Sequence, residues 1–207
     1  MPDGNPEVRR GRKFDQVLDG AREVFMAEGY EGASVDDIAK AAGVSKATLY
    51  SYFPDKKILF MEVARQECER QAEMAGCASP DVIPPRQYLT EFAEAMLTML
   101  LSPFGLAIFR ICVAESERFP QLGREFHESG PMVIRGEMIN YFEAAMERGD
   151  LKIDDFDLAA DQFFEMCKAS LHLKMMLGII DEVPEAERRR VIDGAVETFM
   201  ARYGAPA

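Results

Sequence analysis

The sequence is poor in the residues that build metal centres and disulfide frameworks. It holds only two histidines, His127 and His172, and four cysteines at irregular spacing with no C-x-x-C pair. Zinc sites and disulfide-rich domains use closely spaced cysteines or histidines. We therefore expect no metal site, no disulfide framework and no cofactor.

The sequence also lacks the motifs of the common enzyme classes. It contains no G-x-S-x-G, no G-x-G-x-x-G loop and no P-loop, and His127-Glu128 lacks the second histidine of H-E-x-x-H. These motifs supply a nucleophile, a phosphate cradle or a metal set. An enzyme is therefore not expected.

Long hydrophobic runs are missing as well. The longest apolar stretches are far shorter than a membrane span, and no apolar segment of a secretory signal follows the opening residues. We expect no membrane partner and a cytoplasmic location. With 48% hydrophobic and 29% charged residues, the chain can bury a core in one or two domains.

Acidic residues outnumber basic ones, but they are unevenly distributed. The net charge is −12, from 24 Lys and Arg against 36 Asp and Glu; residues 1–57 hold 9 against 10, and the remainder holds 24 − 9 = 15 against 36 − 10 = 26. Local potential decides where a phosphate backbone docks. The basic residues of the first quarter form two clusters, Arg9, Arg10, Arg12 and Lys13 in an N-terminal arm, and Lys46, Lys56 and Lys57. The arm either contacts DNA or is a solubilising tail.

The apolar pattern of residues 14–53 predicts three helices. An apolar stripe at helical spacing runs from Phe14 to Phe25 and ends at Gly29. Ser34 can cap a short second helix that stops at Gly43, and Ser45 can cap a third.

The third helix has a polar outer face. Leu49, Tyr52 and Phe53 share its inner face, so that Ala47, Thr48, Tyr50 and Ser51 point outward. Two short helices joined by a tight turn, the second with small and hydrogen-bonding residues outward, form a helix-turn-helix whose second helix fits a DNA major groove.

The stretch GYEGASVDDIAKAAGVSKATLYSYFPDKKILF resembles the DNA-binding segment of the TetR family of bacterial transcriptional regulators, and the match covers residues 14–60. The Gly-Val-Ser turn, the Leu-Tyr-x-Tyr-Phe run and the Phe-x-x-Lys-x-x-Leu of Phe53, Lys56 and Leu59 occur together in register. The later segments RICVAESERFPQLGREFHESGP and RGDLKIDDFDLAADQFF resemble the ligand and dimer domain of one subgroup.

The resemblance implies roles in DNA binding for a set of residues. Ser34 and Tyr50 would touch phosphates, Lys46 and Thr48 would approach bases or phosphates, and Lys56 would hold the backbone. Ser34 and Ser45 could instead serve as helix caps alone. Ala47 stands where many members have glycine. The expected DNA-binding residues are Ser34, Ser45, Lys46, Ala47, Thr48, Tyr50 and Lys56.

The remainder of the chain also predicts helices, and no strand pattern competes. A fourth helix covers about 55–75, a proline-rich break follows, and further helices are expected at 86–101, 104–118, 121–129, 132–148, 156–177 and 185–203. We predict an all-α fold with a basic arm (1–13), an N-terminal three-helix helix-turn-helix domain (14–57), and a helical ligand-binding and dimerisation domain (58–207) joined to it through helix four.

The second domain offers soft apolar side chains that suit either a pocket or an ordinary core. The segment 106–114 is apolar except for Arg110, so we expect burial on every side with Glu115 or Glu94 as the partner of Arg110. His172 could face a cavity or be a core histidine. The candidate ligand-binding residues are Met96, Phe109, Arg110, Cys112, Phe142, Phe164, Cys167 and His172.

The last two predicted helices could form half of an intermolecular four-helix bundle, as the resemblance implies, or could pack within one chain. The expected dimer residues are Leu171, Ile192, Ala195, Val196 and Phe199. The resulting hypothesis is a homodimeric regulator, a repressor of a near-palindromic double-stranded DNA operator, which a small, largely apolar effector releases. The alternative is a ligand-independent DNA-binding or scaffolding protein with a packed C-terminal core.

Overall fold

The computed structural model describes residues 11–75, 83–117 and 120–205, and its described elements are helices. The basic cluster at Arg9 and Arg10 lies outside the described residues. In chain order the helices are α1 (Arg12–Gly32), α2 (Val35–Ala41), α3 (Lys46–Tyr52), α4 (Lys56–Ala75), α5 (Pro85–Leu100), α6 (Pro103–Glu115), α7 (Pro120–Ser129), α8 (Pro131–Glu147), α9 (Phe156–Lys168), α10 (Leu171–Met176) and α11 (Glu185–Tyr203). The all-α prediction is confirmed.

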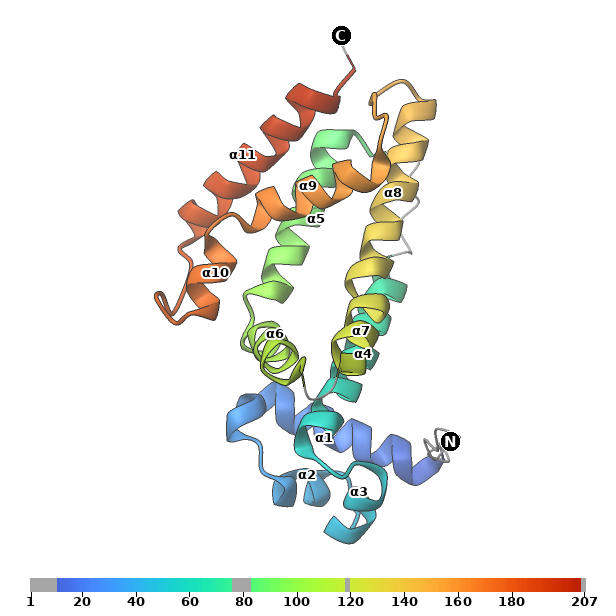
Figure 1. Cartoon of the computed structure of the whole chain (residues 1–207), viewed down its shortest axis with the longest axis vertical. Coiled ribbons are helices and arrows are strands. Elements are labelled where there is room, and N and C mark those ends of the chain that lie inside the picture. The colour runs from blue at the N-terminus through green and yellow to red at the C-terminus, as the bar shows by residue number, and fades with distance from the viewer. Residues whose placement is uncertain (1–10, 76–82, 118–119, 206–207) are drawn as a thin grey trace.

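The molecule is elongated, with α1, α2 and α3 at one end and α5, α8, α9 and α11 in the other part (Figure 1). Helix α6 lies at the junction and contacts both α1 and α4. Within the described residues, no single helix has both the length and the apolar character needed to cross a membrane; only the bent pair α5 and α6, taken together, would reach that length.

Two hydrophobic cores support this arrangement. One joins α5, α8, α9 and α11, and the other joins α1 to α4 with Ile108 and Ile111 of α6. The rings of Phe60 in α4 and Phe104 in α6 lie 5.2 Å apart, edge to face. The N-terminal core therefore extends past residue 57 into α6, so that the two ends of the molecule share buried surface.

Close backbone packing fixes α2 against α1. A Cβ atom at Gly20 would lie 2.4 Å from the backbone nitrogen of Ala42, a distance that no side chain can occupy. The turn between α2 and α3 is made by Gly43 at φ 64°, in the left-handed region that glycine adopts without steric cost. The first helix breaks at Gly29, with φ 71°, as the sequence predicts.

The single helix predicted at 156–177 is divided in the structure. It ends at Lys168, and Ala169 adopts φ 35° and ψ −128° before α10 begins at Leu171. Positive φ is unfavourable for alanine because of its Cβ atom. Neither glycine nor proline marks this break in the sequence, and the bend directs Leu171, His172 and Met175 inward, where they are buried.

Helix α6 is not buried on every side, contrary to the sequence-based expectation. Val113 is 66% exposed, and Arg110 is exposed as well. The guanidinium of Arg110 donates to the carbonyl oxygens of Met175 at 3.0 Å and Met176 at 3.2 Å, at the C-terminal end of α10. Its partners are thus backbone carbonyls at the end of α10, instead of Glu115 or Glu94.

The residues expected in a dimer interface lie in the interior of one chain. Phe199 is fully buried and stacks on Phe142 at 5.1 Å. The apolar stripe of α11 therefore packs against its own domain. The five buried residues are Leu171, Ile192, Ala195, Val196 and Phe199.

Candidate functional site

The outer face of α3 is polar and held by a capped N-terminus. The hydroxyl oxygen of Ser45 accepts a hydrogen bond from the Thr48 amide at 3.1 Å and lies 2.9 Å from the Thr48 hydroxyl. Lys46, Ala47, Tyr50 and Ser51 are exposed, whereas Leu49 is buried beneath them. The predicted orientation of this helix is confirmed.

Ser34 caps α2 in the same way. Its hydroxyl oxygen accepts a hydrogen bond from the Asp37 amide at 3.1 Å, and its hydroxyl group donates to the Asp37 carboxylate. Both serines thus have the cap role that the sequence predicts, while phosphate contact by either remains a prediction.

Lys46, the lysine at the start of α3, is paired within the protein. Its ammonium lies 2.6 Å from the carboxylate of Asp36 in α2, and both side chains are more than half exposed. The hydrogen bond to Asp36 raises the pKa of Lys46. A phosphate that binds Lys46 must therefore compete with this carboxylate, although an exposed ion pair opposes the exchange only weakly.

Lys56 also has partners within the chain. Its ammonium donates to the carbonyl oxygens of Tyr30 at 2.7 Å and Ala33 at 3.0 Å, and it lies 4.3 Å from the centre of the Tyr30 ring. These contacts tie the start of α4 to the C-terminal end of α1. The ammonium retains a third N–H group, so a contact with DNA remains a prediction beside this structural role.

Two ion pairs connect the helix-turn-helix to the rest of the molecule. The ammonium of Lys57 in α4 pairs with the carboxylate of Glu115 in α6, and the guanidinium of Arg22 in α1 donates to Glu67 in α4 at 2.8 Å. Both carboxylates are buried. Lys57 therefore points toward α6, whereas the sequence suggested a lysine that faces DNA.

An apolar cavity of about 500 Å³ lies between α5, α6, α7, α8 and α9. Most of its lining consists of aromatic, aliphatic and methionine side chains, a composition typical of small-molecule sites. The lining residues are Met96, Met99, Leu100, Phe109, Phe126, His127, Gly130, Pro131, Met132, Ile134, Arg135, Asp161, Phe164, Glu165 and Lys168.

Only part of the predicted ligand set lines this cavity. Met96, Phe109 and Phe164 do, whereas Phe142 and Cys167 lie fully buried in the C-terminal core. Burial raises the pKa of the Cys167 thiol to about 12. Cys112 packs at the edge of the N-terminal core, Arg110 binds the end of α10, and His172 lies behind Phe109 with ring centres 4.8 Å apart.

The cavity wall also carries charged residues that were not predicted from the sequence. Arg135 in α8 donates to Asp161 at 2.7 Å and to Asp157 at 2.6 Å, both in α9. Asp157 and Asp161 are four residues apart and therefore share one face of α9. This spacing in the sequence could have indicated a cationic partner, but not which residue supplies the cation.

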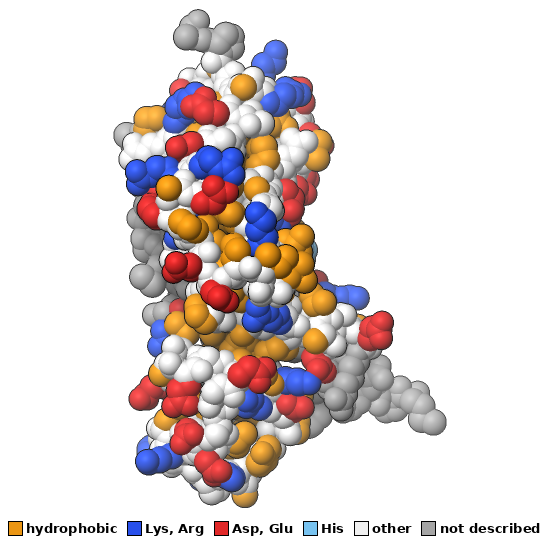
Figure 2. Space-filling view, turned by 90° about the vertical axis from the view of Figure 1, so that its left-hand side faces the viewer, with side chains coloured by type: hydrophobic (Ala, Val, Ile, Leu, Met, Phe, Trp, Pro, Cys, Tyr) orange, Lys and Arg blue, Asp and Glu red, His pale blue; other side chains and the backbone are white. Residues whose placement is uncertain are grey.

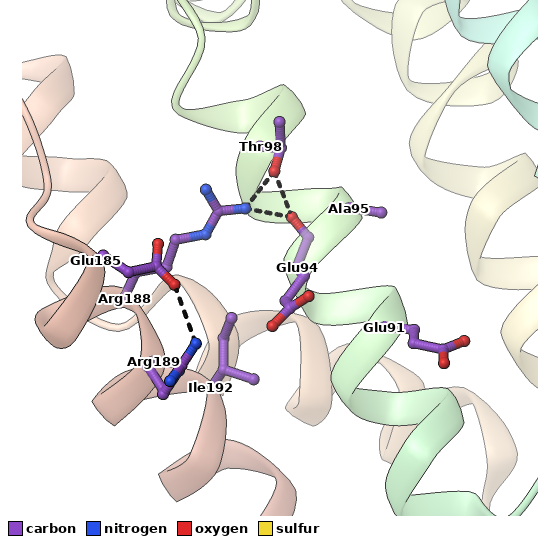
Figure 3. A pocket seen from close by; sticks show the side chains of 8 residues that line it. All are labelled: Glu91, Glu94, Ala95, Thr98, Glu185, Arg188, Arg189 and Ile192. Carbon is purple, nitrogen blue, oxygen red and sulfur yellow. Dashed lines mark hydrogen bonds and ion pairs between the residues drawn. The ribbon is translucent and has the colours of Figure 1, made fainter.

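A second, polar cleft of about 570 Å³ lies between α5 and the start of α11. Figure 3 shows that Arg188 reaches across it to the backbone carbonyl of Glu94, at 2.5 Å, and to the hydroxyl of Thr98, while Arg189 pairs with Glu185. Its arginines are thus already engaged, and it offers little apolar surface to a ligand.

The capped turn and the exposed polar helix define the chain as a helix-turn-helix DNA-binding protein. Residues 17–63 match the model of the bacterial regulatory proteins of the tetR family, and residues 87–205 match that of the C-terminal domain of AefR-like transcriptional repressors. The chain belongs to the TetR family of transcriptional regulators. It is therefore a DNA-binding regulator and not an enzyme.

Similar proteins agree with this assignment. A crystal structure of a TetR-family regulator from Mesorhizobium loti superposes with a TM-score of 0.79 at 30% identity, over 96% of this chain and 100% of that one. The flavonoid-responsive regulator FrrA superposes with a TM-score of 0.66 at 34% identity, with the same coverage. The transcriptional repressor AcnR of Corynebacterium glutamicum is 41% identical over 61 residues, which are 30% of this chain and 32% of AcnR. The match to this curated relative thus spans about a third of its length.

Proposed function

We propose that the protein is a cytoplasmic, homodimeric repressor that leaves a near-palindromic operator when a small, largely apolar effector enters the C-terminal cavity. The cavity of about 500 Å³ carries this proposal, because a ligand-independent protein with a packed core has no need of it. The names of the similar proteins AcnR, a repressor, and FrrA, a flavonoid-responsive regulator, support it.

The DNA contacts follow from the exposed face of α3. Tyr50, Thr48 and Ala47 would meet the major groove, Ser34 and Ser45 would meet phosphates at the two helix N-termini, and Lys46 would exchange Asp36 for a phosphate. Lys56 would hold the adjoining backbone in place. A dimer presents this surface twice, which doubles the length of DNA that is read.

We place the dimer surface outside the core residues first expected there, because these are buried within one chain. The face of α10 and α11 carries hydrophobic side chains at mid-height among charged ones (Figure 2). Leu173, Leu177 and Ile179, on α10 and the loop after it, are each at least 60% exposed. Exposed large apolar side chains that cluster mark interaction sites. We assign them to contact with a second copy of the chain.

Helix α6 provides a route from the cavity to the DNA-binding end. Its Phe109 lines the cavity, its Ile108 and Ile111 belong to the N-terminal core, and its Glu115 holds Lys57. An effector that displaces α6 would move α4 and the helix-turn-helix, and so change the separation of the two recognition helices. Effector and operator would then oppose each other with a coupling of about 1–3 kcal/mol.

Titration of the full chain with DNA from its own promoter tests the regulator proposal. Binding should prefer that DNA to a random duplex, and each phosphate contact should contribute about −0.9 to the slope of log affinity against log salt. Equal affinity for both duplexes at moderate salt would refute operator recognition.

Light scattering tests the assembly. The double variant Leu173→Glu/Leu177→Glu should have a monomer mass and lose operator affinity, because each glutamate would be buried unpaired in the interface. Met26→Glu is the matched control, since Met26 is an exposed apolar residue of α1; it should remain dimeric. A dimer mass for the double variant would refute this surface.

A further inference from the structure

The cationic side chains of the cavity wall already have partners within the protein. Arg135 is bound to Asp161 and Asp157, and Lys168 is bound to Glu165. The two cationic side chains are only 19% and 23% exposed. Their carboxylate partners Asp157, Asp161 and Glu165 are 59–74% exposed, so the pairs lie at the rim of an otherwise apolar wall. A charged ligand inside this wall would lose hydration that the paired side chains do not replace. The wall therefore favours an uncharged ligand.

The apolar part of the cavity wall favours an aromatic ligand. Phe109, Phe126 and Phe164 line the cavity together with methionines. Phe109 and Phe126 meet edge to face, with ring centres 6.4 Å apart. Aromatic rings prefer such offset or perpendicular contacts with other rings, and methionine sulfur packs favourably at ring edges.

The imidazole of His172 lies next to the cavity-lining Phe109 and has a polar atom without a hydrogen-bond partner. It is 9% exposed, and its Nε2 atom has no hydrogen-bond partner among the described residues. Its ring meets the ring of Phe109 at 77°, and Phe109 is the residue that lines the cavity on that side. A buried polar atom without a partner is rare in folded proteins, because it has lost its hydrogen bonds to water.

The surroundings of His172 favour the uncharged imidazole. Burial lowers the pKa of His172, and the nearby Lys168 lowers it further, against the opposing effect of Glu165. A neutral imidazole offers either a donor or an acceptor at Nε2, depending on its tautomer. A hydroxyl group can satisfy both, because it donates and accepts.

We propose that His172 determines effector specificity by binding the hydroxyl group of an uncharged aromatic ligand, which reaches Nε2 when the ring of Phe109 turns aside. The inference rests on the proposed effector cavity and names the ligand class that it takes. Phe109 then separates the polar group from the cavity in the free protein, and its displacement accompanies binding.

Three bicyclic probes of similar size test the ligand class: 2-naphthol, 2-methylnaphthalene and 2-naphthoate. Equilibrium dialysis against the full-chain protein measures the binding of each. We expect 2-naphthol to bind about tenfold more tightly than 2-methylnaphthalene, the value of one buried hydrogen bond. The carboxylate should bind more weakly than 2-naphthol. A carboxylate that binds as tightly as 2-naphthol would refute the uncharged class.

Variants of the two histidines test the role of His172. His172→Phe should remove the preference for 2-naphthol and leave the affinity for 2-methylnaphthalene within about threefold, because only the hydrogen bond is lost. His172→Gln, which keeps a polar group, should restore part of the preference even if the phenylalanine variant folds poorly. His127→Gln is the control, since His127 lines the cavity but is exposed. A preference that survives in both His172 variants would refute the inference.

A cavity-filling variant separates this inference from the proposed function. Ile134→Trp should abolish the binding of all three probes, because Ile134 lines the cavity. Binding of 2-naphthol that Ile134→Trp abolishes but His172→Phe leaves unchanged refutes the role of His172 and supports the effector cavity. Binding that Ile134→Trp leaves unchanged refutes both.

Discussion

Replacing Lys56 by methionine distinguishes a structural role of its ammonium from a contact with DNA. The substitution keeps most of the aliphatic stem and removes the donor that holds the carbonyl oxygens of Tyr30 and Ala33. Tyr30 lies in the last turn of α1, and Ala33 is the residue that follows this helix. Without the ammonium these carbonyl oxygens must bind water or remain unsatisfied.

The contacts give the size of the expected effect. A hydrogen bond to a charged group contributes about 1.5–3 kcal/mol, and a cation over an aromatic ring about 0.5–1 kcal/mol at an exposed site. Lys56 is only half-buried, so water can replace part of this. We expect a loss of about 3 kcal/mol in the free energy of unfolding, or roughly 6–12 °C in melting temperature for a chain of this size.

The assay combines thermal unfolding at one fixed protein concentration with DNA titration over a range of salt. Lys40→Met is the control, because Lys40 is an exposed lysine of α2 and its loss should change stability by no more than about 0.5 kcal/mol. If Lys56 also contacts a phosphate, the salt slope should fall by about 0.9 per subunit.

A Lys56→Met variant with unchanged stability would refute the structural reasoning. If the salt slope then fell by the full amount, the ammonium would act on DNA and its carbonyl contacts would contribute nothing measurable. Lost stability with an unchanged slope would assign the residue wholly to the fold.

Four further predictions follow from other contacts and backbone angles of the structure. Asp36→Asn should strengthen binding to random DNA about two- to fivefold per subunit by releasing Lys46, measured by fluorescence anisotropy. A double-mutant cycle of Lys57→Met and Glu115→Gln should give a coupling energy of about 1–3 kcal/mol in urea unfolding, and additivity would contradict the ion pair. Phe199→Ala should cost about 3–5 kcal/mol in the same assay without a change in light-scattering mass, because the ring lies in the core. Ala169→Gly should stabilise the chain by about 1 kcal/mol, since glycine tolerates its positive φ; a lower melting temperature would refute the strain.

The helices could be predicted from sequence wherever the apolar periodicity and the glycine or proline residues at helix ends agree. Gly29 and Gly43 mark helix boundaries that the structure confirms. The break at Ala169 could not be predicted, because alanine gives no turn signal. Tertiary packing produces it, through burial of His172 and Met175 and through the bonds from Arg110 to the end of α10.

The residues of the candidate sites were harder to predict from sequence than the helices. A stripe such as Ile192 to Phe199 shows that a helix face is buried, but not whether its own chain or a partner buries it. In the same way, Phe109 lines the cavity and Phe142 fills the core, although both are phenylalanines on helices. Only the three-dimensional arrangement distinguishes these environments.

The way α3 is attached bears on how new operators can be acquired. Of its seven residues, only Leu49 is buried, and the cap at Ser45 holds its first turn. Substitutions on its exposed face therefore leave folding almost untouched, within about 0.5 kcal/mol each. Gly20, by contrast, admits no side chain against Ala42. With α3 as the proposed recognition helix, the chain would change its DNA target one residue at a time while the spacing of α1 and α2 stays fixed, so that recognition would evolve independently of stability.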